Sequence, residues 1–171
     1  VIPGDVMPGD LRLAVRKDQM ILRDILQKGI NSISQSDFLS LQKQWFGDVS
    51  QESEREEIKD RLTEKEKEWL EKNKVWRVAN ELDWPPFDFA EEGVPKGYTV
   101  DLVNLALEKI VVTIKWINGY TWAELMGLFR KGEVDVLPAI FKTEDRKKYI
   151  AFTYSYATNP SVLITHADNY K

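Results

Sequence analysis

Charged and aromatic side chains follow two short apolar segments of this chain. Trp84 and Phe87 come after residues 75–79, and Arg146 comes after residues 134–140. An arginine can hold a carboxylate through paired N–H donors, and aromatic rings can stack on a small molecule. If both segments are strands of an open α/β sheet, these side chains lie beyond its carboxyl edge, where ligands bind. The pattern therefore predicts a binding site for a small charged molecule.

Arg146 is the strongest candidate for a ligand contact. It lies near the start of a helix that Thr143 is expected to cap, so that helix-end amides could assist the guanidinium in binding a carboxylate. The competing interpretation is a surface salt bridge with Glu144 or Asp145. Both Arg146 and Thr143 are placed in the candidate site.

The remaining candidates could serve packing as well as binding. Trp84 and Phe87 could form the wall of a pocket, or could pack in a loop beside prolines. Ala139 and Phe141 are expected to line the cleft through their backbone. Asp101 stands at an expected helix start, where an acid that complements the helix dipole is the better interpretation.

Composition excludes several kinds of site. The 171 residues include no cysteine and one histidine, His166, so thiol catalysis, Cys-ligated zinc and a His-rich metal site are not expected. A net charge of −4 argues against a nucleic-acid-binding surface. No apolar run reaches the roughly 20 residues that span a bilayer. No metal or cofactor is expected. Because the chain begins at Val1 without an initiator methionine, it is expected to be a piece of a longer protein.

The first two stretches of the chain differ in character. Residues 1–47 hold an expected strand at 11–15 and two helices, the first capped by Asp18 and the second started by Ser34 or Ser36. Residues 48–74 are strongly charged and read as a solvated linker followed by a short helix. That helix begins at Thr63, which has capping-box spacing to Glu66.

The third stretch, residues 75–171, alternates strands and helices. Strands are expected at 75–80, 112–117 and 134–140 and helices at 100–110, from Thr121 to Gly132 and from Thr143, with a hairpin-like excursion at 87–98 and an extended end at 151–165. Strands separated by helices form right-handed βαβ units with parallel strands. The expected fold class is therefore α/β, a three-layer, mostly parallel sheet with helices on both faces.

Four motifs of the third stretch occur in an order typical of a known family. They lie at 84–89, 97–102, 132–138 and 143–156. Together they resemble the first lobe of periplasmic solute-binding proteins of the amino-acid type, which implies a single lobe of a type II periplasmic-binding-protein-like fold. The lead-in at 62–76 is similar to the Venus flytrap sensor domains found in tandem on bacterial sensor kinases.

Residues 1–47 resemble the carboxyl-terminal end of the same kind of domain. In the family, that end returns from the second lobe, adds a strand inside the first-lobe sheet and packs two helices on it. The resemblance implies that residues 11–15 enter the sheet beside residues 134–140, as in a circular permutation, so that 1–47, 48–74 and 75–171 form one compact lobe. A domain-swapped dimer is the competing way to supply that strand.

The resemblance also implies a function. It predicts an extracytoplasmic, non-catalytic sensor lobe that binds a small polar, amino-acid-like solute between two lobes and signals to a kinase or cyclase module. Its partners would be the solute and another flytrap domain of the same membrane-anchored receptor. Arg146 matches the family arginine that binds the ligand α-carboxylate, whereas Phe141 stands where a small hydroxyl residue is usual.

Two other functions stay open. The lobe could be a spacer that binds no ligand, which the Phe141 departure favours. A flytrap-fold enzyme, such as a dehydratase or a cell-wall lytic module, would need an acid or base in the cleft. The only candidates for that role are Glu81, Asp83, Asp88 and Asp101, and no pair among them stands out.

Overall fold

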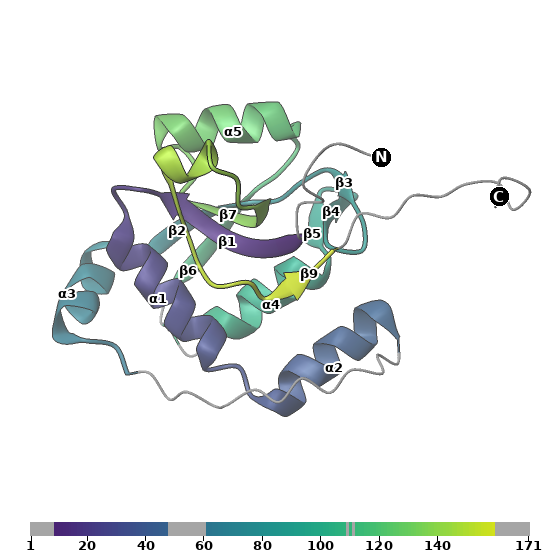
Figure 1. The fold of residues 1–171 in the computed structure, drawn as a ribbon, viewed down its shortest axis with the longest axis horizontal. Helices are drawn as coiled ribbons and strands as arrows, with labels where there is room; N and C mark the ends of the chain where they lie inside the picture. Colours follow the sequence, from purple (N-terminus) through teal and green to yellow (C-terminus); the bar gives the residue numbers. More distant parts are fainter. Residues whose placement is uncertain (1–8, 48–60, 109, 111, 160–171) are drawn as a thin grey trace, which may run out of the picture.

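A mixed β-sheet forms the centre of the molecule (Figure 1). The computed structural model describes residues 9–47, 61–108, 110 and 112–159. The strand order is β6–β2–β7–β1–β8, and β9 also pairs with β1. The bounds are β6 Thr113–Ile117, β2 Val75–Ala79, β7 Val136–Phe141, β1 Asp10–Arg16, β8 Ile150–Phe152 and β9 Ala157–Thr158.

The amino-terminal strand β1 lies inside this sheet, between β7 and β8. It runs antiparallel to both, with Ala14 opposite Leu137 and Val15 opposite Val136, whereas β2 is parallel to β6 and β7. The backbone groups along the inner edge of β7 are thereby paired within the same chain, as buried groups require. The predicted insertion of residues 11–15 beside residues 134–140 is confirmed. The sheet is mixed because the inserted strand is antiparallel to its neighbours.

Helices cover both faces of the sheet and form three layers with it (Figure 1). Successive residues of a strand point to opposite faces, and β1 follows this rule. Leu13 and Val15 join one core with α1, α2 and α4, whereas Ala14 joins a second core with α5. The helix bounds are α1 Met20–Asn31, α2 Gln35–Phe46, α3 Glu64–Lys72, α4 Tyr98–Leu107 and α5 Trp122–Lys131. The predicted α/β class with helices on both faces is confirmed.

Most helix ends follow the predicted signals. Thr63 and Thr121 both form complete capping boxes, and Ser34 caps α2 by accepting a hydrogen bond from a backbone N–H. The prediction for Asp18 is wrong, because Gln19 is the N-cap of α1 and the Asp18 carboxylate instead lies 3.5 Å from the Arg16 guanidinium.

The helix expected from Thr143 is reduced to a three-residue 3-10 turn, η1 (Arg146–Lys148). Acid–base pairs within that turn connect Glu144 with Lys147 and Asp145 with Lys148. A three-residue turn offers no row of helix-end amides, so the amides that were expected to assist Arg146 are absent here.

A small antiparallel sheet follows β2 and corresponds to the predicted hairpin-like excursion. It contains β3 (Asp83–Trp84), β4 (Asp88–Glu91) and β5 (Val94–Lys96). Gly97 leads from β5 into α4 with a φ of 125°, and a Cβ at this position would lie 2.4 Å from the Phe87 carbonyl oxygen. Only glycine fits this approach, which holds the excursion against the start of α4.

None of the helices in the described ranges has the length and apolar character that a membrane span needs. The expected linker at 51–59 and His166 lie outside the described residues. Of the expected extended end at 151–165, the structure describes residues 151–159, and this part contains β9 and most of β8.

Candidate functional site

A small cavity lies at the carboxyl ends of β2 and β7, where the topology of an α/β sheet favours ligand binding. Its volume is about 330 Å³. Three separate parts of the chain meet there: the segment after β2, the end of β7 with the turn that follows it, and the start of α5. The lining residues are Glu81, Asp83, Trp84, Trp122, Ala139, Ile140, Phe141 and Arg146. We refer to this cavity as the cleft.

Arg146 is held in the cleft by its neighbours. Its Nη1 donates a hydrogen bond of 2.7 Å to the Phe141 carbonyl oxygen, and its guanidinium carbon lies 5.7 Å from the centre of the Trp122 ring. Its backbone N–H donates to Thr143 Oγ1 at 3.3 Å. Among the described residues, no carboxylate forms an ion pair with Arg146, since Glu144 and Asp145 pair with lysines. The guanidinium keeps N–H donors for an anion.

Two aromatic rings form a wall of the cleft. Trp84 and Phe141 meet edge to face with ring centres 5.8 Å apart. Phe87 packs against Trp84 with ring centres 5.5 Å apart and is 9% exposed, so it supports this wall from the core side. Phe141 therefore occupies space in the cleft that a small residue would leave open.

Acidic groups make up the rest of the cleft. Glu81 lies just after the end of β2, beside Asp83. Burial, together with the nearby charge of Asp88, raises the pKa of Glu81 to about 7. A cleft lined by an arginine and two carboxylates can bind a solute that carries a carboxylate and a cationic side chain.

The structure brings four of the seven predicted site residues to the cleft: Trp84, Ala139, Phe141 and Arg146. Phe87 lies behind them. Thr143 Oγ1 accepts the Arg146 backbone N–H, as the expected capping role requires, although the N-cap of η1 is Asp145. Asp101 lies apart from the cleft and lines a different hollow.

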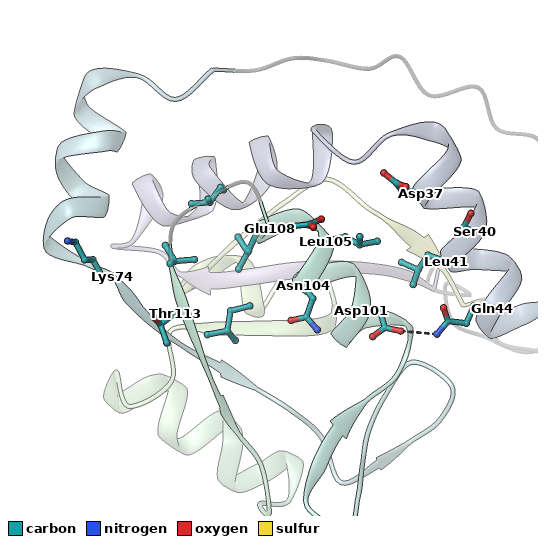
Figure 2. A pocket seen from close by; sticks show the side chains of 14 residues that line it. Asp37, Ser40, Leu41, Gln44, Lys74, Asp101, Asn104, Leu105, Glu108 and Thr113 are labelled. Carbon is teal, nitrogen blue, oxygen red and sulfur yellow. Dashed lines mark hydrogen bonds between the residues drawn. The ribbon is translucent and has the colours of Figure 1, made fainter.

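Asp101 connects two helices. Its carboxylate accepts a hydrogen bond from Gln44 Nε2 at 3.2 Å (Figure 2). It accepts a second one from Trp45 Nε1 at 2.8 Å, and both donors lie on α2. These bonds fasten α2, which comes from the amino-terminal stretch, to α4. The position of Asp101 is therefore explained by helix packing.

The hollow beside Asp101 is larger than the cleft, with a volume of about 1130 Å³ (Figure 2). It is open, and it lies between α2, α4 and the amino-terminal ends of β2 and β6, where Lys74 and Thr113 stand. Its described charged groups are Asp37, Asp101, Glu108 and Lys74, so no arginine faces a ligand there. Position and chemistry both favour the smaller cleft as the site.

Trp122 is the cleft residue that sequence reasoning missed. It is the first residue of α5, directly after the capping Thr121. The loop from β6 to α5 leaves the sheet at the same carboxyl edge as β2 and β7, because these strands are parallel. The predicted parallel direction of these strands would have been enough to place Trp122 at the same edge of the sheet as Trp84.

The described part of the chain contains no group of three or more His, Cys, Asp or Glu side chains that could hold a metal ion. The side chains that line the cleft include one arginine, two carboxylates and three aromatic rings.

Sequence comparison links this geometry to known proteins. The model of the bacterial extracellular solute-binding proteins, family 3, matches residues 76–171. The sensor protein EvgS of Escherichia coli O157:H7 is 21% identical over 150 residues, which cover 87% of this chain and 12% of EvgS. The virulence sensor protein BvgS of Bordetella pertussis is 23% identical over 169 residues, which cover 98% of this chain and 14% of BvgS. The chain thus spans a small part of these sensors.

Two arginine-binding proteins are also similar. The L-arginine-binding protein of Pseudomonas aeruginosa is 29% identical over 97 residues, covering 54% of this chain and 36% of that protein. The crystal structure of the arginine-bound form of domain 1 from TmArgBP superposes with a TM-score of 0.41 and 28% identity, covering 47% of this chain and 64% of that domain.

Proposed function

Because this chain belongs to the bacterial extracellular solute-binding proteins, family 3, we propose that its cleft holds a small polar, amino-acid-like solute. The observation that carries the proposal is the convergence of Arg146, Trp122 and Glu81 from three parts of the chain on one cavity. The carboxylate of the solute would bind the N–H groups of Arg146 that the Phe141 carbonyl leaves free. Thr143 supports this contact by fixing the turn.

A cationic amino acid fits the cleft best among such solutes. Glu81 and Asp83 supply negative charge in the same cleft as Arg146, and the Trp84 and Trp122 rings offer faces for a cationic group. Two of the similar proteins are described as arginine-binding, which supports the same class. Phe141 narrows the cleft, so the solute would stack against its ring.

The lobe is proposed to bind without catalysis. Of the four carboxylates considered for catalysis, Asp101 lies in another hollow and Asp88 is 1% exposed, so these two do not present a carboxyl group to the cleft. We propose that residues 1–47 derive from the end of one flytrap domain, that 48–74 link it to the next and that 75–171 begin that next domain. The second lobe would complete the cleft, and closure around the solute would signal to a kinase or cyclase module of a membrane-anchored, extracytoplasmic receptor.

A spacer without ligand is the second candidate function. The contact between Phe141 and Trp84, with ring centres 5.8 Å apart, is the observation that favours it, because it fills part of the cleft. The two functions differ in a simple respect: a spacer has no saturable affinity for any amino acid, whereas a sensor lobe has.

The test is calorimetric titration of the chain with L-arginine, L-lysine, L-glutamine and L-glutamate. Saturable binding of one of them is expected in the wild type. Arg146→Ala should weaken it by roughly 10- to 100-fold, since a charge-assisted hydrogen bond contributes about 1.5–3 kcal/mol. Arg130→Ala is the matched control, because Arg130 stacks on Tyr149 and lines a separate pocket with it. Equal loss in both variants, or no binding by the wild type, would contradict the proposal.

A further inference from the structure

A buried carboxyl group lies directly beneath the cleft. Asp88, on β4, is 1% exposed, and Asn80, at the end of β2, is 0% exposed. Asn80 Nδ2 donates to Asp88 Oδ1 at 2.6 Å and to the Phe89 carbonyl oxygen at 2.9 Å. The backbone N–H of Glu81 also donates to the Asp88 carboxylate. These bonds tie Asp88 to the residue that lines the cleft.

The hydrogen bonding of this group is incomplete for a carboxylate. Asp88 Oδ2 and Asn80 Oδ1 are both buried, and neither accepts a hydrogen bond from the described residues. No Lys or Arg within the described ranges forms an ion pair with Asp88. An ionised carboxylate buried without a cation is costly, and a proton on Oδ2 removes that cost. Burial accordingly raises the pKa of Asp88 to about 7.

Glu81 extends this charge to the cleft. Its carboxyl lines the cavity, and the charge of Asp88 adds to burial in raising the pKa of Glu81. Among the described residues, the titratable or charged groups near these two carboxyls include Asp83 and Arg146, which line the cleft, and Tyr156, on which the charge of Asp88 acts. Tyr156 is buried, and burial holds its pKa well above the ordinary value, so it stays neutral. The charge of the buried Asp88 therefore acts on Glu81, whose carboxyl lines the cleft.

We propose that solute binding in the cleft is coupled to proton release from the Glu81–Asp88 pair, so that a cationic ligand group and a proton compete for the same negative charge. This inference rests on the proposed function, because it assigns a regulation to that site. When a cation enters beside Glu81, a carboxyl O–H bond breaks, the proton passes to the buffer, and the cation neutralises the carboxylate. A ligand of the same shape without the cation leaves the proton in place.

The coupling predicts a distinct pH profile. Affinity for a cationic amino acid should rise by up to about tenfold per pH unit while the pair is protonated, and should level off once it is ionised. The affinity of an uncharged analogue should stay nearly constant over the same range. L-Arginine and L-citrulline are suitable probes, because they have similar shapes and only arginine carries the side-chain charge.

The experiment is calorimetric titration of the chain with both probes between about pH 6 and pH 8, in two buffers of different ionisation enthalpy, which counts the protons released. Arginine should release a fraction of a proton at the lower pH and almost none at the higher, and citrulline should release none at either. Asp88→Asn should flatten the arginine profile, and Glu81→Gln should reduce the preference for arginine over citrulline. Glu68→Gln, an exposed position on α3, is the control and should behave as the wild type.

Each outcome decides between the two proposals. Equal pH profiles for arginine and citrulline, or an unchanged arginine profile in both Asp88→Asn and Glu81→Gln, would overturn the coupling and leave the binding function standing. If neither probe nor any other amino acid binds at any pH to a folded wild type, the proposed function fails and the coupling fails with it. Circular dichroism of each variant checks that folding is retained. Glu81→Gln tests the coupling without a substitution at the buried Asp88.

Discussion

Removing the titratable charge at Asp88 should change how the stability of the fold depends on pH. Burial raises the pKa of Asp88 from 3.8 to about 7 in the folded chain. Between about pH 4 and pH 7, the folded state therefore holds a proton that the unfolded state has released. The free energy of unfolding falls as pH rises through this window and becomes constant above it.

The size of the effect follows from the two pKa values. At 1.36 kcal/mol per pKa unit, raising the pKa of Asp88 from 3.8 to about 7 corresponds to about 4 kcal/mol of lost stability at high pH. About 2.5 kcal/mol of this loss falls between pH 5 and pH 8. Asp88→Asn removes the loss. It also disturbs the hydrogen bonds from Asn80 and from the Glu81 backbone, but that cost is nearly independent of pH.

The assay is urea unfolding of the wild type and of Asp88→Asn, followed by tryptophan fluorescence at about pH 5 and about pH 8. The stability of the variant relative to the wild type should improve by about 2–3 kcal/mol between these pH values. Glu68→Gln should show no such change, because its side chain is exposed. A difference below about 0.5 kcal/mol would refute the reasoning, since it would mean that Asp88 is already ionised in the folded chain at low pH.

Three further substitutions test the scaffold. Leu13→Ala should cost about 2–5 kcal/mol in urea unfolding, because Leu13 is fully buried in the core on one face of the inserted β1; a cost like that of a surface substitution would contradict the insertion. Gly97→Ala should lower the free energy of unfolding by about 2 kcal/mol or more, because the added Cβ would clash with the Phe87 carbonyl oxygen at a residue with positive φ. An unchanged free energy of unfolding would show that the backbone at residue 97 lies farther from Phe87 than in this structure. Thr121→Ala should cost about 1 kcal/mol through loss of the capping box, measured against Thr113→Ala on an exposed strand position.

The scaffold could be predicted largely from sequence patterns. Residues 11–15 are too short for a helix and almost wholly apolar, and these local properties predict a strand. Local sequence does not give the neighbour of that strand in the sheet; the resemblance to a known family implied its place beside residues 134–140. The capping boxes at Thr63 and Thr121 were also predicted, because they depend on spacing alone.

The cleft could be predicted only in part. Burial of a charged side chain is decided by packing between distant segments, so the pairing of Asp88 with Asn80 beneath the cleft had no sequence signal. For the same reason, the sequence could not show that Asp101 accepts a hydrogen bond from Trp45 of α2, which lies 56 positions earlier in the chain. Trp122 could have been placed by strand direction, which a residue-by-residue survey does not consider.

The central claim is that the cleft at the carboxyl ends of β2 and β7 is the solute site. Among the six tryptophans of the chain, only Trp84 and Trp122 line this cleft, whereas Trp45 lies at the end of α2 and donates to Asp101. Titration of the isotope-labelled chain with L-arginine, followed through the indole N–H resonances in NMR spectra, tests the claim most directly. Saturable shifts of the Trp84 and Trp122 resonances, with the others nearly unchanged, are the predicted result. Shifts confined to Trp45, or no shift at saturating arginine and at the other amino acids, would contradict it.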